Sequence, residues 1–210
     1  MIELFGSALV TFLVIIDPPG CAPIFASLTR GTSPAHRRAM AIRSSLNAWA
    51  ILMFFALLGR PLLHALGISL ASFRIAGGIL LFYIAVDMVL ERRTQRREER
   101  AHSIEGTPDA EDISVFPMAM PMISGPGSIA SAMLWVSRAE DPAHVAVVLA
   151  AITVVILITM ATLLAAVPMM RLIGDKVEAA ITRILGVILA ALAAQFVIDG
   201  LKQSFPNVLA

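Results

Sequence analysis

Apolar residues run along the chain in six long stretches, which short polar or charged segments separate. A helix needs about 20 apolar residues to cross a bilayer core of about 30 Å, and each stretch is close to that length. The pattern therefore predicts an all-α membrane protein with six transmembrane helices near residues 4–25, 44–66, 68–90, 115–136, 145–170 and 181–201.

Two of these stretches are interrupted by Pro and Gly. The first contains Asp17-Pro18-Pro19-Gly20, and the fourth contains Ser124-Gly125-Pro126-Gly127 at the corresponding place. Pro disfavours the α conformation in the residue before it, so each run predicts the end of one half-helix and the start of another. Asp17 and Ser124 are the expected N-caps of the second half-helices. Pro kinks in otherwise ordinary helices are the simpler alternative.

The two halves of the chain resemble each other around these breaks. The segment that begins at Pro61 resembles the one that begins at Pro168, and these two segments are as far apart in the sequence as the two breaks are. Similar segments also begin at Arg74 and Arg183. Because each half has three helices, an odd number, the second half would be inverted relative to the first. We therefore expect two inverted three-helix repeats, residues 1–90 and 115–210, whose first helices are broken at mid-membrane.

Basic residues are unevenly distributed between the loops. With the N-terminus outside, most of the 16 Lys and Arg residues lie on the cytoplasmic side, and the outside keeps only Arg60, Arg74, Arg138 and Lys202. The positive-inside rule then predicts that both termini lie outside. The linker 91–114, basic and then acidic, becomes a cytoplasmic loop. We interpret it as a solvated connection, with a lipid-headgroup or partner contact as the alternative.

Composition supports the membrane assignment and excludes other classes. Hydrophobic residues make up 58% of the chain, charged residues 15%, and the mean hydropathy is +0.84. A soluble protein of this composition would expose large apolar patches. The net charge of +1 does not indicate nucleic-acid binding. Cys21 is the only cysteine, which excludes an intrachain disulfide and a cysteine-based metal cluster.

The two breaks carry the candidate chemistry. A half-helix N-terminus presents free N–H groups and a positive dipole end, which suit a carboxylate. A buried Asp costs about 2.5–3.5 kcal/mol on insertion scales, so Asp17 is also the candidate for binding a coupling Na⁺ or a proton. The candidate binding residues are Asp17, Pro18, Gly20, Cys21, Asn47, Ser124, Gly125, Gly127, Ser128 and Ile129.

Other polar residues support weaker hypotheses. Tyr83 and Asp87 share a helix face beside the basic residues that begin at Arg92, which favours a charge pair at the helix end. Asp17 and Asp87 could instead form the carboxylate pair of an intramembrane enzyme, although no nucleophile or metal cluster accompanies them. Small residues around the breaks could also serve only close helix packing. We expect no catalytic residue, metal or cofactor.

Segments 12–25 and 117–129, which contain the two breaks, resemble the signature segments of the MarC family, and the resemblance covers essentially the whole chain. It implies a multi-pass protein of the bacterial inner (plasma) membrane. Transporters of the SnatA type, a similar archaeal branch, carry glycine and alanine. Such a zwitterionic amino acid could place its carboxylate at the half-helix N-terminus and its ammonium near Asp17. The resemblance therefore implies a secondary transporter of a small neutral amino acid, which could be homo-oligomeric, with a non-transporting scaffold or regulator as the alternative. Many members have Asn where this chain has Cys21.

Overall fold

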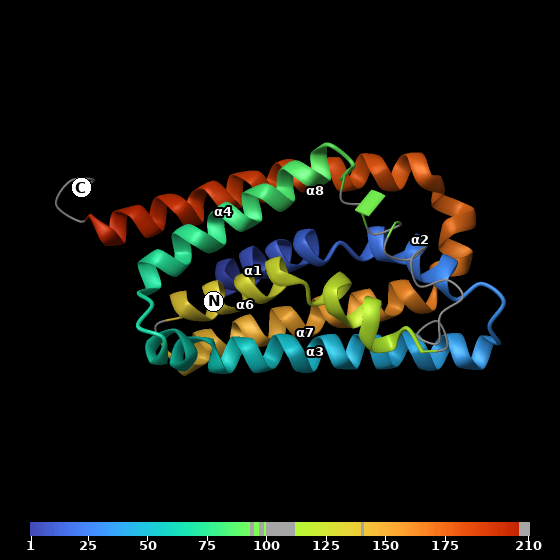
Figure 1. Cartoon of the computed structure of the whole chain (residues 1–210), viewed down its shortest axis with the longest axis horizontal. Helices are drawn as coiled ribbons and strands as arrows, with labels where there is room; N and C mark the ends of the chain where they lie inside the picture. Colours follow the sequence, from blue (N-terminus) through green and yellow to red (C-terminus); the bar gives the residue numbers. More distant parts are fainter. Residues whose placement is uncertain (93–94, 97–98, 100–111, 140, 206–210) are drawn as a thin grey trace.

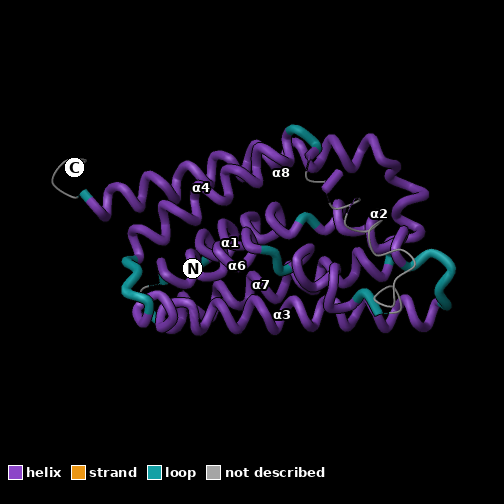
Figure 2. The backbone as a smooth tube through the Cα atoms, in the orientation of Figure 1, coloured by secondary structure: helices purple, strands orange, loops and turns teal. Residues whose placement is uncertain are grey.

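The computed structural model describes residues 1–92, 95–96, 99, 112–139 and 141–205, and it describes only the backbone of 171–176 and 178. Within this part of the chain every regular element is a helix, as Figures 1 and 2 show. The elements in chain order are α1 (Ile2–Ile16), α2 (Pro18–Leu28), α3 (Pro34–Ala65), α4 (Leu70–Val89), η2 (Ser114–Ile123), α6 (Pro126–Arg138), α7 (Pro142–Leu164) and α8 (Ala166–Ser204).

Five segments of the described chain are long and apolar enough to cross a membrane, whereas the hydropathy pattern predicts six. They are Ile2–Leu28, Pro34–Ala65, Leu70–Val89, Pro142–Leu164 and Ala179–Ser204. Ile2–Leu28 contains both α1 and α2. The predicted fourth span, 115–136, forms two helices, η2 and α6, and neither is long enough to be counted among the five.

Prolines account for this difference. Pro117 and Pro121 lie inside η2, each after a cis peptide bond, and the residues before them, Phe116 and Met120, have extended backbone conformations. Proline lacks the N–H that a regular helix requires and keeps the preceding residue out of the α region. The apolar stretch therefore cannot continue as one long helix, although hydropathy alone does not distinguish it from the others.

Three helix boundaries differ clearly from the predicted spans: the start of α3, the end of α7 and the start of α8, which lies at Ala166 rather than at position 181. α3 begins at Pro34, where Ser33 accepts a hydrogen bond from the backbone N–H of His36 at 3.2 Å, so the helix extends well beyond the predicted span 44–66. α7 ends at Leu164 rather than at position 170. Pro168 then lies in the first turn of α8, where a missing N–H leaves no intrahelical bond unmade. Hydropathy reports the apolar part of a helix and not its capped ends.

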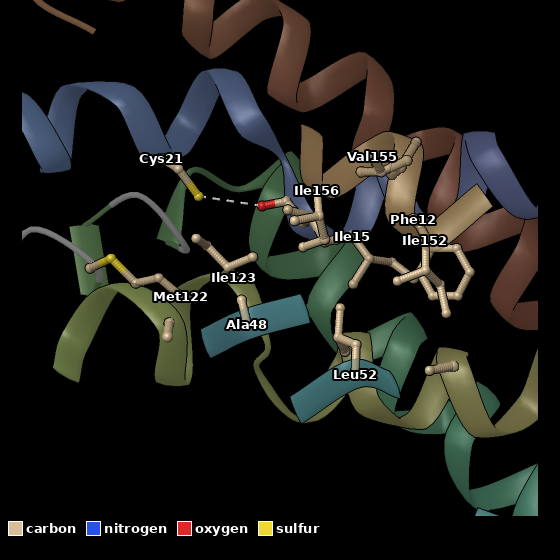
Figure 3. Packing of buried hydrophobic residues seen from close by; sticks show 14 of the residues in the cluster. Phe12, Ile15, Cys21, Ala48, Leu52, Met122, Ile123, Ile152, Val155 and Ile156 are labelled. Carbon is tan, nitrogen blue, oxygen red and sulfur yellow. Dashed lines mark hydrogen bonds between the residues drawn. The ribbon is translucent and has the colours of Figure 1, made fainter. Parts of the chain in front are cut away.

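The helices lie side by side along the long axis of the molecule. In Figure 1, α3 runs along one side, α4 and α8 run together along the other, and α1, α6 and α7 lie between them. The core is apolar and tightly packed, with Phe12, Ile15, Leu52 and Ile152 among its buried residues (Figure 3). Large apolar side chains remain exposed on the outer helices, as a bilayer-facing surface requires: Phe54, Leu57, Ile79, Phe82, Leu157, Ile184 and Val187.

Glycines allow α4 and α8 to approach each other closely. A Cβ atom on Gly78 would lie 2.9 Å from the carbonyl oxygen of Ala193, and one on Gly200 would lie 3.0 Å from that of Ala71. Both are backbone atoms, so a side chain at either glycine would push the helices apart. Small residues serve this purpose at membrane helix interfaces, where burial of apolar surface alone drives little association.

Candidate functional site

The first break lies at Asp17, between α1 and α2. Asp17 has φ 56° and ψ 67°, the left-handed conformation that ends α1, and its carboxylate accepts a hydrogen bond from the N–H of Gly20 at 3.2 Å. Pro18 follows in the first turn of α2. Asp17 is therefore the N-cap of α2, as predicted. It is 1% exposed, and Thr182 of α8 donates a hydrogen bond to the same carboxylate at 3.4 Å.

The second break has a different cap from the one predicted. Gly125, with φ −70° and ψ 174°, is the N-cap of α6, so the assignment of Ser124 to this role is wrong. The hydroxyl of Ser124 points back and donates to the carbonyl oxygen of Ala119 at 2.7 Å. Its backbone N–H bonds to the same oxygen, so Ser124 closes the end of η2. Pro126 occupies the first turn of α6, which makes the residue before it extended.

A short polar side chain spans each break in the same way. The thiol of Cys21 donates to the carbonyl oxygen of Ile16 at 3.5 Å, and the hydroxyl of Ser128 donates to that of Ile123 at 2.8 Å (Figure 3 shows the Cys21 contact). Ile16 and Ile123 are the last residues of the helices before the breaks. The last carbonyls of a helix accept no hydrogen bond from within that helix, and the hydrocarbon core of a bilayer contains no donor for them. The side chains of Cys21 and Ser128 therefore supply these hydrogen bonds from inside the protein. The sequence indicated both residues but not this role.

A partly open cavity of about 250 Å³ lies at the second break. The start of α6 forms one wall and α4 another, while Ile15 of α1 contributes from the first break. The lining is largely apolar, with polar and charged groups at one place. The lining residues that can contact a polar solute are Tyr83, Asp87, Arg96, Gly127 and Ser128.

Asp87, Arg96 and Tyr83 form the charged part of this cavity. Asp87 is 6% exposed and forms an ion pair with Arg96, whose guanidinium also donates to the hydroxyl of Tyr83 at 2.9 Å and lies 5.6 Å from its ring centre. The hydrogen bond with Tyr83 and the charge of Asp87 raise the pKa of Arg96 above its usual value. The expected helix-end charge pair of Asp87 is confirmed. Its partner, Arg96, lies in the linker, which we interpret from the sequence as a solvated connection with a lipid-headgroup or partner contact as the alternative.

The predicted site residues fall into separate groups. Gly125, Gly127 and Ser128 line the cavity. Asp17, with the adjacent Pro18, Gly20 and Cys21, lies at the first break and does not line it. Three further candidates do not line the cavity: Ser124 is fully buried, Ile129 packs against the apolar core, and Asn47 is half-buried on α3.

Most of the linker 91–114 lies outside the described residues, as do Arg93, Arg97 and Arg100 among its basic residues. Arg96 is described, and it is the functional candidate that sequence reasoning missed. The sequence signal for Arg96 was the i, i+4 pair Tyr83 and Asp87, because both side chains can accept hydrogen bonds from the basic residues that follow α4. The sequence could not show which of several arginines would return to it.

A second polar cluster lies at the other end of α6. Arg60 of α3 and Arg74 of α4 both donate to the carbonyl oxygen of Ser137, at 2.8 and 3.5 Å. Arg138 forms an ion pair with Asp199 of α8 and lies 4.2 Å from the ring centre of Phe196. The cluster therefore ties three helices to the end of α6. It contains three of the four basic residues that the sequence places outside.

Long apolar helices with exposed apolar side chains, together with buried charged groups, define a polytopic α-helical membrane protein. The chain belongs to the MarC family of integral membrane proteins, which it matches over residues 2–205. No solved structure matches it significantly.

Relatives of similar length occur in archaea and bacteria. The chain is 36% identical to a UPF0056 membrane protein of Archaeoglobus fulgidus, over 99% of this chain and 96% of that protein. It is 35% identical to the UPF0056 membrane protein YhcE of Escherichia coli, over 93% and 90%. It is 31% identical to the UPF0056 inner membrane protein YhgN of the same organism, over 94% and 95%. These names state a location in the membrane and no activity.

Proposed function

We propose that this protein is a secondary transporter of a small zwitterionic solute, of the size of glycine or alanine, in a bacterial inner membrane. The cavity at the second break carries the proposal, because it joins a helix N-terminus to a buried carboxylate and a guanidinium. Its volume of about 250 Å³ corresponds to the share of roughly eight water molecules in the liquid, which is enough for one small solute with some water.

The groups around the cavity match both charges of such a solute. The first N–H groups of a helix have no partner within the helix, and those of Gly127 and Ser128 would bind the carboxylate. Asp87 would bind the ammonium group in place of Arg96. We therefore revise the expected position of the ammonium, because Asp87 lines this cavity and Asp17 does not.

Asp17 remains the proposed site of the coupling ion. Its carboxylate is buried, caps α2 and accepts a hydrogen bond from Thr182 of α8. Binding of Na⁺ or a proton there would alter the contact between the first break and α8. Ile15, two residues before Asp17, lines the cavity, so a shift at this break would reach the solute. Buried ionisable groups in membrane helices commonly have such a role.

The packing of the helices supports two inverted repeats. If α1 and α2 correspond to η2 and α6, α3 to α7, and α4 to α8, a two-fold axis should exchange the contacts between them. α1 and α2 pack on α7, as η2 and α6 pack on α3; α2 packs on α8, as α6 packs on α4. The pairs α3 with α7 and α4 with α8 are also in contact, as self-related pairs must be.

Alternating access follows from this arrangement. The cavity lies at the start of α6, and the arginine cluster ties the other end of α6 to α3, α4 and α8. With both termini outside, the cavity would face the cytoplasm and the arginine cluster would close the outer side. Transport would then require the ion pair of Arg138 and Asp199, which is formed in this structure, to open so that the solute can pass on the outer side.

Uptake of labelled alanine or glycine into proteoliposomes, with and without Na⁺ or proton gradients, tests the proposal. We expect saturable uptake that Asp87→Asn reduces by at least tenfold and that Asp17→Asn uncouples from the ion gradient. Glu3→Gln, which removes an exposed carboxylate in the first turn of α1, is the matched control and should transport normally. The absence of gradient-driven flux for a panel of small zwitterions would refute transport and leave the scaffold hypothesis.

The alternative of an intramembrane enzyme has less support. Asp17 and Asp87, its candidate carboxylate pair, are held by different partners, Gly20 and Thr182 for the first and Arg96 for the second. Only Asp87 lines the cavity. A shared catalytic role requires both carboxylates to reach one substrate.

A further inference from the structure

A second cavity, of about 400 Å³, lies where α3 begins and α7 ends. Pro34, Arg37 and Arg38 line it from the first turns of α3, and Leu163 and Leu164 line it from the last turn of α7. The proposed transport mechanism does not use any of these residues. The cavity therefore combines two guanidinium groups with an apolar wall.

The two arginines are available to a ligand. In the described part of the chain neither forms an ion pair with a carboxylate. Arg37 donates to the carbonyl oxygen of Thr29 through a long contact of 3.4 Å, and its buried Nε has no hydrogen-bond partner there. Arg38 is exposed. Two guanidinium groups without a counter-charge at one cavity attract an anion, and the positive end of the α3 dipole adds to this attraction.

The apolar wall indicates what kind of anion this is. Leu163 is fully buried, whereas Leu164 is 43% exposed at the end of a helix that can cross the membrane. A ligand in this cavity would therefore contact both the basic residues and the bilayer-facing surface. An anionic phospholipid has this form, with a phosphate beside its acyl chains, whereas a free phosphate would gain nothing from the leucines.

We propose that this cavity binds the phosphate group of an anionic phospholipid. Arg37 and Arg38 hold the phosphate oxygens through charge-assisted, bidentate hydrogen bonds, and the acyl chains continue along Leu164. The positive-inside orientation places the cavity on the cytoplasmic side, where the leaflet is rich in anionic lipid. The site fixes the ends of α3 and α7 at the headgroup level.

Lipid binding by the purified protein tests this site, with phosphatidylglycerol, phosphatidylcholine or inorganic phosphate added in detergent and bound lipid counted by native mass spectrometry. We expect phosphatidylglycerol to bind in preference to phosphatidylcholine. Near an anionic surface each basic residue contributes about fivefold to affinity, so the double variant Arg37→Gln, Arg38→Gln should bind roughly 30-fold more weakly.

Two further variants make the result specific. Arg37→Lys with Arg38→Lys keeps both charges but loses the bidentate geometry, so its affinity should lie between wild type and the double Gln variant. Arg92→Gln removes an exposed basic residue that follows α4, and this variant should bind phosphatidylglycerol normally. Equal binding of phosphatidylcholine, competition by inorganic phosphate at equal concentration, or full binding by the double Gln variant would each overturn the proposal.

Discussion

Gly125 is the position where one added methyl group should disturb the second break most directly. In Gly125→Ala the new Cβ would lie 2.4 Å from the carbonyl oxygen of Pro121. A carbon and an oxygen in ordinary contact are about 3.3 Å apart, so the end of η2 and the start of α6 must separate by roughly 1 Å. The backbone of Gly125 has φ −70°, which any residue can adopt, so the requirement for glycine is purely steric.

The cost of this substitution follows from two opposing effects. Overpacking against a backbone atom costs about 1–3 kcal/mol, and the smaller conformational freedom of alanine in the unfolded chain returns about 0.4–1 kcal/mol. We expect a net loss of about 1–2 kcal/mol, which lowers the Tm of a chain of this size by about 2–8 °C. A displacement of about 1 Å in binding groups can also reduce activity roughly 100-fold, so uptake should fall strongly.

Thermal unfolding in detergent, followed by circular dichroism at one fixed scan rate, measures the first effect, and uptake into proteoliposomes measures the second. Gly6→Ala is the matched control, because a Cβ there would meet no atom within 4 Å inside α1. It should leave the Tm unchanged or raise it slightly. A Gly125→Ala protein that unfolds with the control and transports like wild type would show that the break tolerates the added atom.

Three further predictions concern single side chains. Ser128→Ala removes the hydroxyl that donates to the carbonyl of Ile123 and should cost about 1 kcal/mol of stability. Cys21→Ala should cost less, because a thiol is a weaker donor. Equal Tm values for both variants and wild type would contradict this prediction. Arg96→Gln leaves Asp87 buried without its counter-charge, so the Tm should fall and alanine uptake should differ from that of wild type. A variant with unchanged Tm and uptake would show that the ion pair of Asp87 and Arg96 has no role. Hydrogen bonds from Ser114 and the charge of Arg43 lower the pKa of Asp112. The carboxylate should therefore stabilise the protein at neutral pH, and this contribution should disappear only as the pH falls through that depressed pKa. Asp112→Asn should remove this acid-dependent change in Tm, and an identical acid profile in the variant would refute the assignment.

The helical class and the position of the first break could be predicted from the sequence because they depend on local rules. Helix length follows from the thickness of the bilayer, and the backbone after Ile16 follows from the two prolines and the capping carboxylate of Asp17. The same local rules failed at Ser124. Both Ser124 and Gly125 can precede a helix, and the carbonyl of Ala119, released by the turns at Pro117 and Pro121, bonds the side chain of Ser124 instead.

The partners of the charged residues could not be predicted, because ion pairs join residues far apart in the sequence. Asp87 was expected to meet a basic residue, yet hydropathy and spacing do not select Arg96 from its neighbours. Arg138 and Asp199 come from α6 and α8, and only the packing of those helices brings them together. Similarly, the sequence indicates a mid-membrane position for Asp17 and a helix-end position for Asp87, but only the tertiary structure shows which of the two lines the cavity.

The sequence by itself determined that this is an all-helical membrane protein with an interruption at Asp17, since composition, apolar length and proline chemistry act within one segment. Its two motif segments carry the resemblance to the MarC family, to which the chain belongs. The tertiary structure decided where the cavity lies, which carboxylate lines it and which arginine returns from the linker. Those features depend on contacts between α1, α4 and α6, and no local pattern encodes the distances between separate helices.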